Sequence, residues 1–422
     1  MAPITFLTLN VKGLNSPQKR RMALIDLCRQ RGEIVFLQET HFRADAAPSL
    51  TSRYYPQSYF SNYVTSKTRG VAILVARHVP FVCTHQRTDP QGRYLFIKGL
   101  IGSRKITLAN IYLPNTGQCG ALRSTLSKLS SFQEGLLVCG GDFNVPLDTN
   151  PESVKPTPTP EPSLRRRFMQ LLHQHQLIDG WRVLNPSVKD FTFYSHAAKT
   201  YSRLDTFMMS HHHLHALRSA SIAPITWSDH APVLCAIEVL TTPPPQCTWR
   251  LNESLLRDVV IRQDIKDNVE HYFAENSTSD VSLPMIWEAH KCVIRGKLIQ
   301  IGAQRKKTHR ESVTTLLARI HDLETEHKTS RSISVFKELT IHRAKLNTIL
   351  SDQAFKSLRH TKQLFYTQGN RCGKLLARAL KRKQQTTFIP KVQSDTGTDL
   401  HLNTDITEAF HKYFSTLYQL RD

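Results

Sequence analysis

A short apolar run at residues 136–138 is followed by Gly-Gly-Asp-Phe-Asn at residues 140–144. Such a run is typical of a buried strand, and the two glycines end it. Asp142 and Asn144 stand two residues apart, so an extended backbone places both side chains on one face at the end of the strand. Taken alone, the segment fits an ordinary Asx turn as well as a functional site. The choice between the two depends on the other strands of the chain.

Apolar strands that end on polar side chains recur along the first 240 residues. Strands are predicted at residues 4–11, 34–37, 71–76, 94–101, 106–113 and 232–240, a hairpin with strands at 191–195 and 201–207, and helices at 16–31, 119–133 and 163–177. Polar residues at or near these strand ends are Asn10, Glu39, Tyr112, Asp142, Asn144, Asp205, Asp229 and His230. Because strands with a common direction bring their ends together, we expect these side chains to share one site.

These residue types predict phosphodiester hydrolysis. Carboxylates without a cluster of Cys and His ligands suit Mg²⁺ or Mn²⁺ rather than zinc. The pair Asp229-His230 suits an imidazole held in one tautomer beside a phosphate. Asn and Tyr side chains supply neutral donors to phosphate oxygens, while a metal offsets the charge of the transition state. The cluster of His211, His212, His213 and His215 is interpreted as an exposed helix start or loop in preference to a metal site.

The charge of the chain restricts its partners. The formal charge of +22 and the pI near 9.8 predict a polyanionic partner, nucleic acid in preference to an anionic membrane surface. None of the eight cysteines has a Cys-x-x-Cys spacing, so neither a zinc ribbon nor a disulfide framework is expected. We recognise no signal peptide and no membrane-spanning run, and the expected location is the nucleus, with the cytoplasm as the alternative.

The composition changes after residue 240, where the prolines at 243–245 predict a hinge and helical spacing follows. Two rows of apolar residues at helical spacing, separated by a turn at residues 328–334, predict an antiparallel helical pair: Leu316, Ile320 and Leu323, and Leu339, Leu346 and Leu350. Residues 291–390 carry 22 Lys and Arg against 6 Asp and Glu. We therefore expect two domains, an α/β domain at residues 1–240 and a basic, mainly α-helical region at 241–422 that is available for RNA.

Six short motifs stand in order along the first domain: Thr-Leu-Asn-Val-Lys-Gly-Leu at residues 8–14, Leu-Gln-Glu-Thr at 37–40, Asn-Ile-Tyr-Leu-Pro-Asn at 110–115, Gly-Asp-Phe-Asn at 141–144, Ser-Arg-Leu-Asp at 202–205 and Ser-Asp-His-Ala-Pro at 228–232. Each motif is weak evidence alone, but six in order are strong evidence. The chain in this respect resembles the endonuclease/exonuclease/phosphatase superfamily. That resemblance implies a four-layered α/β/β/α sandwich over residues 1–240, followed by the mostly helical basic extension.

Within the superfamily, the chain is similar to the apurinic-type endonucleases of non-LTR retrotransposons. The similarity rests on Asn-Val-Lys-Gly-Leu-Asn-Ser-Pro at residues 10–17 and on the basic helical region, which resembles the connector before a reverse transcriptase. No Tyr/Phe-x-Asp-Asp polymerase signature occurs in the sequence, so we expect no polymerase activity from this chain.

The resemblance also implies roles for the residues at the strand ends. Glu39, with Asn10 close by, would bind the divalent metal. Asp142, helped by Asn144, would handle the proton of the attacking water or of the leaving oxygen. The other implied roles are contact with the scissile phosphate for Tyr112, orientation of groups around metal and phosphate for Asp205, a place on the phosphate opposite the metal for His230, positioned by Asp229, and DNA contact for Thr192, Ser202, Arg203 and Asn115.

The implied function is Mg²⁺-dependent nicking of double-stranded DNA that leaves a 3′-hydroxyl for target-primed reverse transcription, with Mn²⁺ as a possible substitute. Two other hypotheses stay open at this point. One is an apurinic-site repair endonuclease or 3′-exonuclease similar to exodeoxyribonuclease III, and the other is a catalytically idle nucleic-acid-binding transposon remnant. A phosphoinositide phosphatase shares the fold, but the basic connector argues against it.

Overall fold

The computed structural model describes most of the chain, namely residues 3–45, 47–148, 162–239, 251–277, 282–368, 392–394, 399–400 and 403–419. Residues 1–354 form one compact unit, and residues 355–422 form a second. The predicted hinge at residues 243–245 lies outside the described residues, and the domain boundary expected at residue 240 stays a prediction.

Six strands form the first sheet of unit 1, in the order β13-β14-β1-β2-β4-β3. They are β1 (Ile4–Asn10), β2 (Ile34–Gln38), β3 (Gln57–Ser61), β4 (Val71–Val75), β13 (Leu217–Ile222) and β14 (Val233–Ile237). β1 and β2 run parallel, and the other neighbours are antiparallel. The parallel pair brings the ends of β1 and β2 to the same edge of the sheet.

The second sheet has the order β5-β6-β7-β8-β12-β9. Its strands are β5 (Phe81–Thr88), β6 (Tyr94–Ile101), β7 (Arg104–Tyr112), β8 (Leu136–Asp142), β9 (Leu177–Asp179) and β12 (Asp205–Ser210). β7 and β8 are parallel, and β12 is antiparallel to β8. The hairpin is shorter than predicted: it consists of β10 (Phe193–Ser195) and β11 (Thr200–Ser202), because the next residues leave it and pair with β8 as β12.

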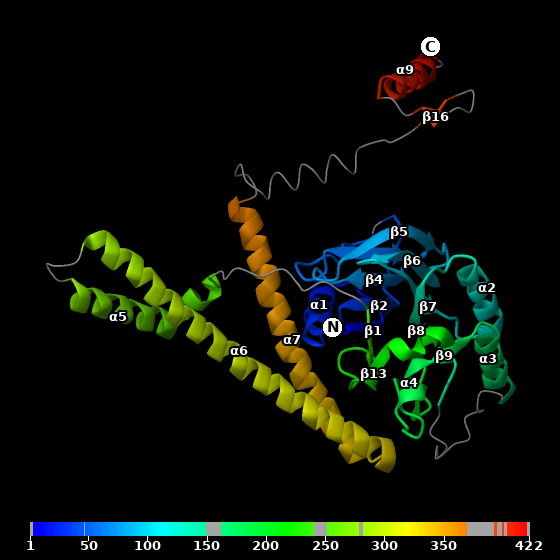
Figure 1. Ribbon diagram of the computed structural model, residues 1–422, viewed down its shortest axis with the longest axis horizontal. Helices are drawn as coiled ribbons and strands as arrows, with labels where there is room; N and C mark the ends of the chain where they lie inside the picture. Colours follow the sequence, from blue (N-terminus) through cyan, green and yellow to red (C-terminus); the bar gives the residue numbers. More distant parts are fainter. Residues whose placement is uncertain are drawn as a thin grey trace. The chain divides into compact units, whose positions relative to one another are not determined.

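The two sheets pack face to face, and helices cover them. Phe6 and Phe36 of the first sheet meet Phe207 of the second, with ring centroids 6.4 and 5.6 Å from that of Phe207. α1 (Pro17–Arg29) packs against the first sheet, and α2 (Gln118–Ser130) and α3 (Pro162–Gln174) pack against the second (Figure 1). As predicted, Ser16 caps α1 and Pro17 opens it. The predicted four-layered sandwich is confirmed.

Two further short elements complete the sandwich. α4 (Gly180–Leu184) follows β9 directly, and the side chain of Asp179 caps it. The histidine cluster forms a 3₁₀ helix, η1 (His211–Ala216), in agreement with the predicted helix start or loop.

Long helices follow the sandwich. They are η2 (Glu253–Arg257), α5 (Val259–Asn276), α6 (Leu283–Ser330) and α7 (Ile333–Gln368). α6 and α7 form the predicted antiparallel pair, and the side chains of Ile320, Leu323, Leu339, Leu346 and Leu350 are buried in one cluster. Unit 2 contains β15 (Val392–Gln393), β16 (Asp399–Leu400) and α9 (Asn403–Gln419). None of the helices described here has the length and apolar character needed to cross a membrane.

Gly141 is the glycine that the second sheet needs most. Its φ is +151°, and a Cβ built on it would lie 1.8 Å from the carbonyl oxygen of Ile111 on the neighbouring strand. We expect Gly141→Ala to lower the free energy of unfolding by about 3 kcal/mol or more, since backbone strain and overpacking add. Urea denaturation followed by circular dichroism measures this loss.

Gly120 in α2 provides the control, because a Cβ there meets no atom within 4 Å. Gly120→Ala should leave stability unchanged or raise it by about 0.5–1 kcal/mol. Equal stability of Gly141→Ala and the wild type would contradict the prediction.

Candidate active site

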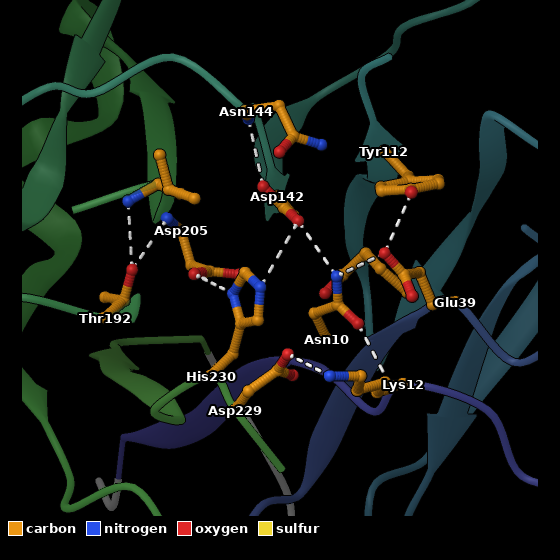
Figure 2. A network of polar contacts seen from close by, with 12 residues as sticks. Asn10, Lys12, Glu39, Tyr112, Asp142, Asn144, Thr192, Asp205, Asp229 and His230 are labelled. Carbon is orange, nitrogen blue, oxygen red and sulfur yellow. Dashed lines mark hydrogen bonds and ion pairs between the residues drawn. The ribbon is translucent and has the colours of Figure 1, made fainter. Parts of the chain in front are cut away.

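The polar residues at the strand ends lie together where the two sheets meet (Figure 2). Asn10 ends β1, and Glu39 follows β2, which is parallel to it. Tyr112 and Asp142 end the parallel strands β7 and β8 in register, and Asp205, at the start of β12, pairs in register with Asp142. The sheet topology therefore places residues that are far apart in sequence in one site.

Asn10 connects the two sheets. Its Nδ2 donates to Oε1 of Glu39 at 3.0 Å and to Oδ2 of Asp142 at 2.9 Å. Its Oδ1 accepts the backbone N–H of Lys12 at 3.1 Å, which fixes the orientation of the amide. Asn10 is 1% exposed, so these hydrogen bonds are shielded from water. Removing one partner would leave a buried polar group unpaired, which lowers the free energy of unfolding. One amide thus holds two carboxylates from different sheets.

Glu39 is held in its ionised form. Burial opposes ionisation, but hydrogen bonds from His41, Asn10 and Tyr112 outweigh it and lower the pKa of the carboxyl to about 2. The hydroxyl of Tyr112 donates to Oε1 of Glu39 at 2.8 Å. Burial and the charge of Glu39 raise the pKa of Tyr112, which keeps this donor protonated. The backbone of Glu39 has a φ of +54°, a strained value that is uncommon for a residue with a side chain and is concentrated at functional sites.

Asp142 and Asp205 are the two fully buried carboxylates of the site, at 1% and 0% exposure. Burial, together with the nearby charge of Asp205, raises the pKa of Asp142 to about 7. The backbone N–H of Asn144 donates to its Oδ1 at 2.9 Å, and the Asn144 side chain donates to the carbonyl of Leu113. A carboxylate with such a pKa exchanges a proton readily near neutrality.

His230 is paired with Asp205. Its Nδ1 lies 2.7 Å from Oδ2 of Asp205, and its Nε2 lies 4.0 Å from Oδ2 of Asp142. Burial lowers the pKa of His230, but the charge and hydrogen bond of Asp205 outweigh this and raise it to about 10. The imidazole is therefore held as a cation that directs Nε2 toward Asp142.

The partner of His230 differs from the expectation. The resemblance predicts that Asp229 positions His230, but Asp229 accepts a hydrogen bond from Nζ of Lys12 at 2.7 Å, while Nδ1 of His230 lies against Asp205. Asp205 positions His230 instead. It does so because β12 pairs with β8, which places Asp205, the first residue of β12, beside Asp142. A sequence neighbour is thus replaced by a residue 25 positions away.

The site has the groups that a divalent cation needs. Carboxylate oxygens of Asp142 and Asp205 and a ring nitrogen of His230 all lie within 4.8 Å of one another, and Oδ1 of Asp205 is buried without a hydrogen-bond partner among the described residues. Glu39 adds a third carboxylate. Three carboxylates against one imidazolium leave an excess of negative charge on hard oxygen atoms, which fits Mg²⁺ or Mn²⁺. The residues therefore fit a metal-dependent site.

Comparison with known proteins agrees with this geometry. The model of the endonuclease/exonuclease/phosphatase family matches residues 7–230, which is more than half of the chain. The chain belongs to the endonuclease/exonuclease/phosphatase family. All the strand-end residues described above fall within the matched region.

A curated relative and two solved structures are also similar to the chain. The transposon TX1 uncharacterized 149 kDa protein of Xenopus laevis is 29% identical over 271 residues, which are 62% of this chain and 20% of that protein. An AP endonuclease of Leishmania major has a TM-score of 0.50 at 18% identity and covers 57% of this chain and 89% of its own. An AP endonuclease of Archaeoglobus fulgidus has a TM-score of 0.45 at 19% identity over 56% of this chain and all of its own.

The match to a transposon protein confirms the resemblance expected from the motifs. The chain spans only a fifth of that relative's length. The likeness to the AP endonuclease of Leishmania major confirms the fold of this family member.

Two of the residues expected to contact DNA are buried instead. Thr192 is 0% exposed, and its Oγ1 accepts the backbone N–H groups of Leu204 and Asp205 at 3.0 and 3.1 Å. Thr192 therefore holds the start of β12, and with it the carboxylate that orients His230. Ser202 is half-buried and Asn115 is exposed, so both keep surface available for DNA.

Arg203 is the second buried residue of this group, at 2% exposure. Its guanidinium pairs with Asp148 and Asp179 at 2.6 Å each and lies 4.8 Å from the centre of the Trp181 ring. The two carboxylates and the ring enclose the guanidinium. Arg203 is therefore buried in the protein and does not form part of the surface expected to contact DNA. The residue links the loop after β8 to β9.

Proposed function

We propose that this protein is a divalent-metal-dependent DNA endonuclease that nicks one strand and leaves a 3′-hydroxyl. The observation that carries the proposal is the arrangement around Asp142. An ionised Glu39 lies on one side of it through Asn10, and the His230–Asp205 pair lies on the other. A phosphodiester between them meets a metal-binding carboxylate on one side and a cationic donor on the other.

We assign Glu39, with Asn10, to the metal, which is Mg²⁺ with Mn²⁺ as a substitute. His230 is a poor ligand because its Nδ1 is bonded to Asp205 and its pKa is raised, so it stays protonated. When bound, the metal would offset negative charge on the phosphate oxygens. Asp205 stays with His230 as its orienting partner.

The remaining residues account for the proton and the phosphate. Asp142 takes a proton from the attacking water while the water oxygen bonds to phosphorus and the P–O3′ bond breaks. His230 donates through Nε2 to a phosphate oxygen, and Tyr112 contacts the same phosphate from the Glu39 side. The departing 3′ oxygen takes up a proton from solvent water and becomes the hydroxyl that a polymerase needs. Asn144 keeps Asp142 in place through its backbone N–H.

Nicking of supercoiled plasmid tests the function directly. The purified protein should convert supercoiled plasmid to open circle in Mg²⁺, and the nick should be extended by an added polymerase, because that requires a free 3′-hydroxyl. Absence of nicking together with salt-sensitive DNA binding would favour the idle-remnant hypothesis instead.

A duplex with one abasic site, compared with the same duplex intact, separates the repair hypothesis. Comparable cleavage of both supports the proposal, whereas cleavage confined to the abasic site favours a repair endonuclease. The match to a transposon protein supports priming of reverse transcription as the biological purpose. RNA binding by the basic helical region and a nuclear location stay predictions.

A further inference from the structure

The α6–α7 pair is packed on the endonuclease sandwich. Met22 of α1 is buried in the same cluster as Ile320 and Leu323 of α6, and Trp227 packs against that cluster. Trp227 belongs to the loop at residues 225–229, which leads directly into His230. The helical pair therefore contacts the segment that carries a residue of the active site.

Buried polar contacts join the same elements. Oε2 of Glu324 on α6 accepts the backbone N–H of Ile225 at 3.3 Å, and its Oε1 lies 3.3 Å from Nη2 of Arg343 on α7. The hydroxyl of Tyr201 on β11 and Nδ1 of His327 on α6 are 2.8 Å apart. Since such groups are costly to bury unless paired, these contacts fix the helices against the loop and the β10–β11 hairpin.

A cavity of about 320 Å³ lies between α7 and this loop. Its wall is formed by residues from both sides, among them Lys12, Tyr194, Trp227, Asp229, Phe336 and Arg343. Asp229 immediately precedes His230, so the cavity adjoins the site at which the scissile phosphate is expected. Its volume is at the lower end of the range found for ligand pockets.

The cations of this cavity have hydrogen-bond donors to spare. Lys12 donates to Asp229, and an ammonium group has three N–H donors. Nε of Arg343 is buried without a hydrogen-bond acceptor among the described residues, its Nη2 has only the ion pair with Glu324 at 3.3 Å, and the Arg343 side chain is 14% exposed. Glu324, the carboxylate beside Arg343, is itself buried behind it and does not line the cavity. Two cations thus face the cavity against one carboxylate, Asp229.

We propose that this cavity binds a backbone phosphate of the substrate DNA, next to the scissile phosphate, with Arg343 and Lys12 as its cations. The inference rests on the proposed function. A guanidinium forms paired hydrogen bonds with phosphate, and the aromatic side chains of Tyr194 and Phe336 pack against the adjoining sugar. The helical extension is then part of the DNA-binding surface of the endonuclease.

Salt dependence of DNA binding tests the proposal. Binding of a short fluorescent duplex, measured by anisotropy in EDTA so that no cleavage occurs, gives log K against log salt for each variant. Loss of one phosphate contact lowers the magnitude of this slope by about 0.9. We expect that loss for Arg343→Gln, a raised KM with little change in kcat for plasmid nicking, and recovery of the slope in Arg343→Lys.

A second variant separates phosphate binding by Arg343 from a purely structural role of this residue. Arg343→Gln alone leaves Glu324 buried without its cation, so Glu324→Gln/Arg343→Gln removes both charges of the pair. Thermal unfolding followed by circular dichroism is the check that this double variant is folded. The double variant should also lose the slope, whereas an unchanged slope would overturn the proposal. Arg319→Gln, which breaks an exposed pair with Glu338 on the same helices, is the matched control and should bind as the wild type does.

The wild-type protein distinguishes the two proposals. Nicking by the wild type with an unchanged slope in the double variant rejects the phosphate site and leaves the endonuclease proposal standing. A wild type that neither binds nor nicks DNA rejects both. Salt-dependent binding without nicking, with the slope lowered in the double variant, supports the phosphate site and rejects only the nuclease activity.

Discussion

His230→Ala should lower the rate of plasmid nicking by on the order of 10²- to 10⁴-fold, the range found when a positioned acid or base is removed. The reason is the loss of the cation that the structure directs at Asp142, 4.0 Å away, and thus at a phosphate bound between them. Initial rates of conversion of supercoiled plasmid measure the effect, with Mg²⁺ in excess. Binding in EDTA should change little by comparison.

Asp205 and Asp229 provide a matched pair of carboxylates for this prediction. Asp205→Asn removes the charge that holds the imidazole as a cation and should approach the His230→Ala loss. Asp229→Asn removes the partner of Lys12 and should cost less. The exposed His212→Ala in η1 should nick at the wild-type rate. An Asp229→Asn loss larger than that of Asp205→Asn would show that the pairing seen here is not the one used in catalysis.

Glu39→Gln should raise the Mg²⁺ concentration needed for half-maximal nicking by at least about 10-fold, since even residues that only orient a metal ligand cost 10- to 100-fold in affinity. The substitution keeps the size of the side chain and removes the charge that hydrogen bonds from His41, Asn10 and Tyr112 preserve down to a pKa of about 2. Titration of the nicking rate with Mg²⁺, and again with Mn²⁺, measures the shift. EDTA should abolish nicking by the wild type, and added Mg²⁺ should restore it.

Glu134→Gln is the control for Glu39→Gln, because Glu134 is exposed and pairs with Lys105 outside the site. Its Mg²⁺ requirement should equal that of the wild type. A Glu39→Gln enzyme with an unchanged Mg²⁺ requirement but a reduced maximal rate would assign the metal to the Asp142 and Asp205 carboxylates instead.

Asn10, Glu39, Tyr112 and Asp142 could be predicted because each ends or follows an apolar run typical of a buried strand, and Asp205 and His230 could be predicted because each precedes such a run. The helical pair could be predicted for a similar reason, since its leucines repeat at helical spacing. Edge strands were harder. β5 and β13 carry mostly polar or partly exposed residues, so their apolar pattern is too weak to distinguish them from loops.

Pairings between distant residues were the part of the site that sequence could not provide. Asp229 stands beside His230 in the chain, but sheet register brings Asp205 to it. Arg203 belongs to the same Ser-Arg-Leu-Asp motif as Asp205, and an arginine there is expected to be exposed. In the structure Asp148 and Asp179 enclose it. Both outcomes depend on which strands become neighbours, and residue spacing alone does not contain that information.

The pairing of β1 with β14 has a genetic consequence. These strands come from opposite ends of the sandwich in sequence, yet they lie side by side in one sheet, and β1 ends on Asn10 while the segment before β14 carries His230. A gene copy that lacks the first 39 codons loses Asn10 and Glu39. A copy that ends before codon 230 loses His230. On the roles proposed for these residues, we expect a copy shortened from either side to encode a protein without nuclease activity.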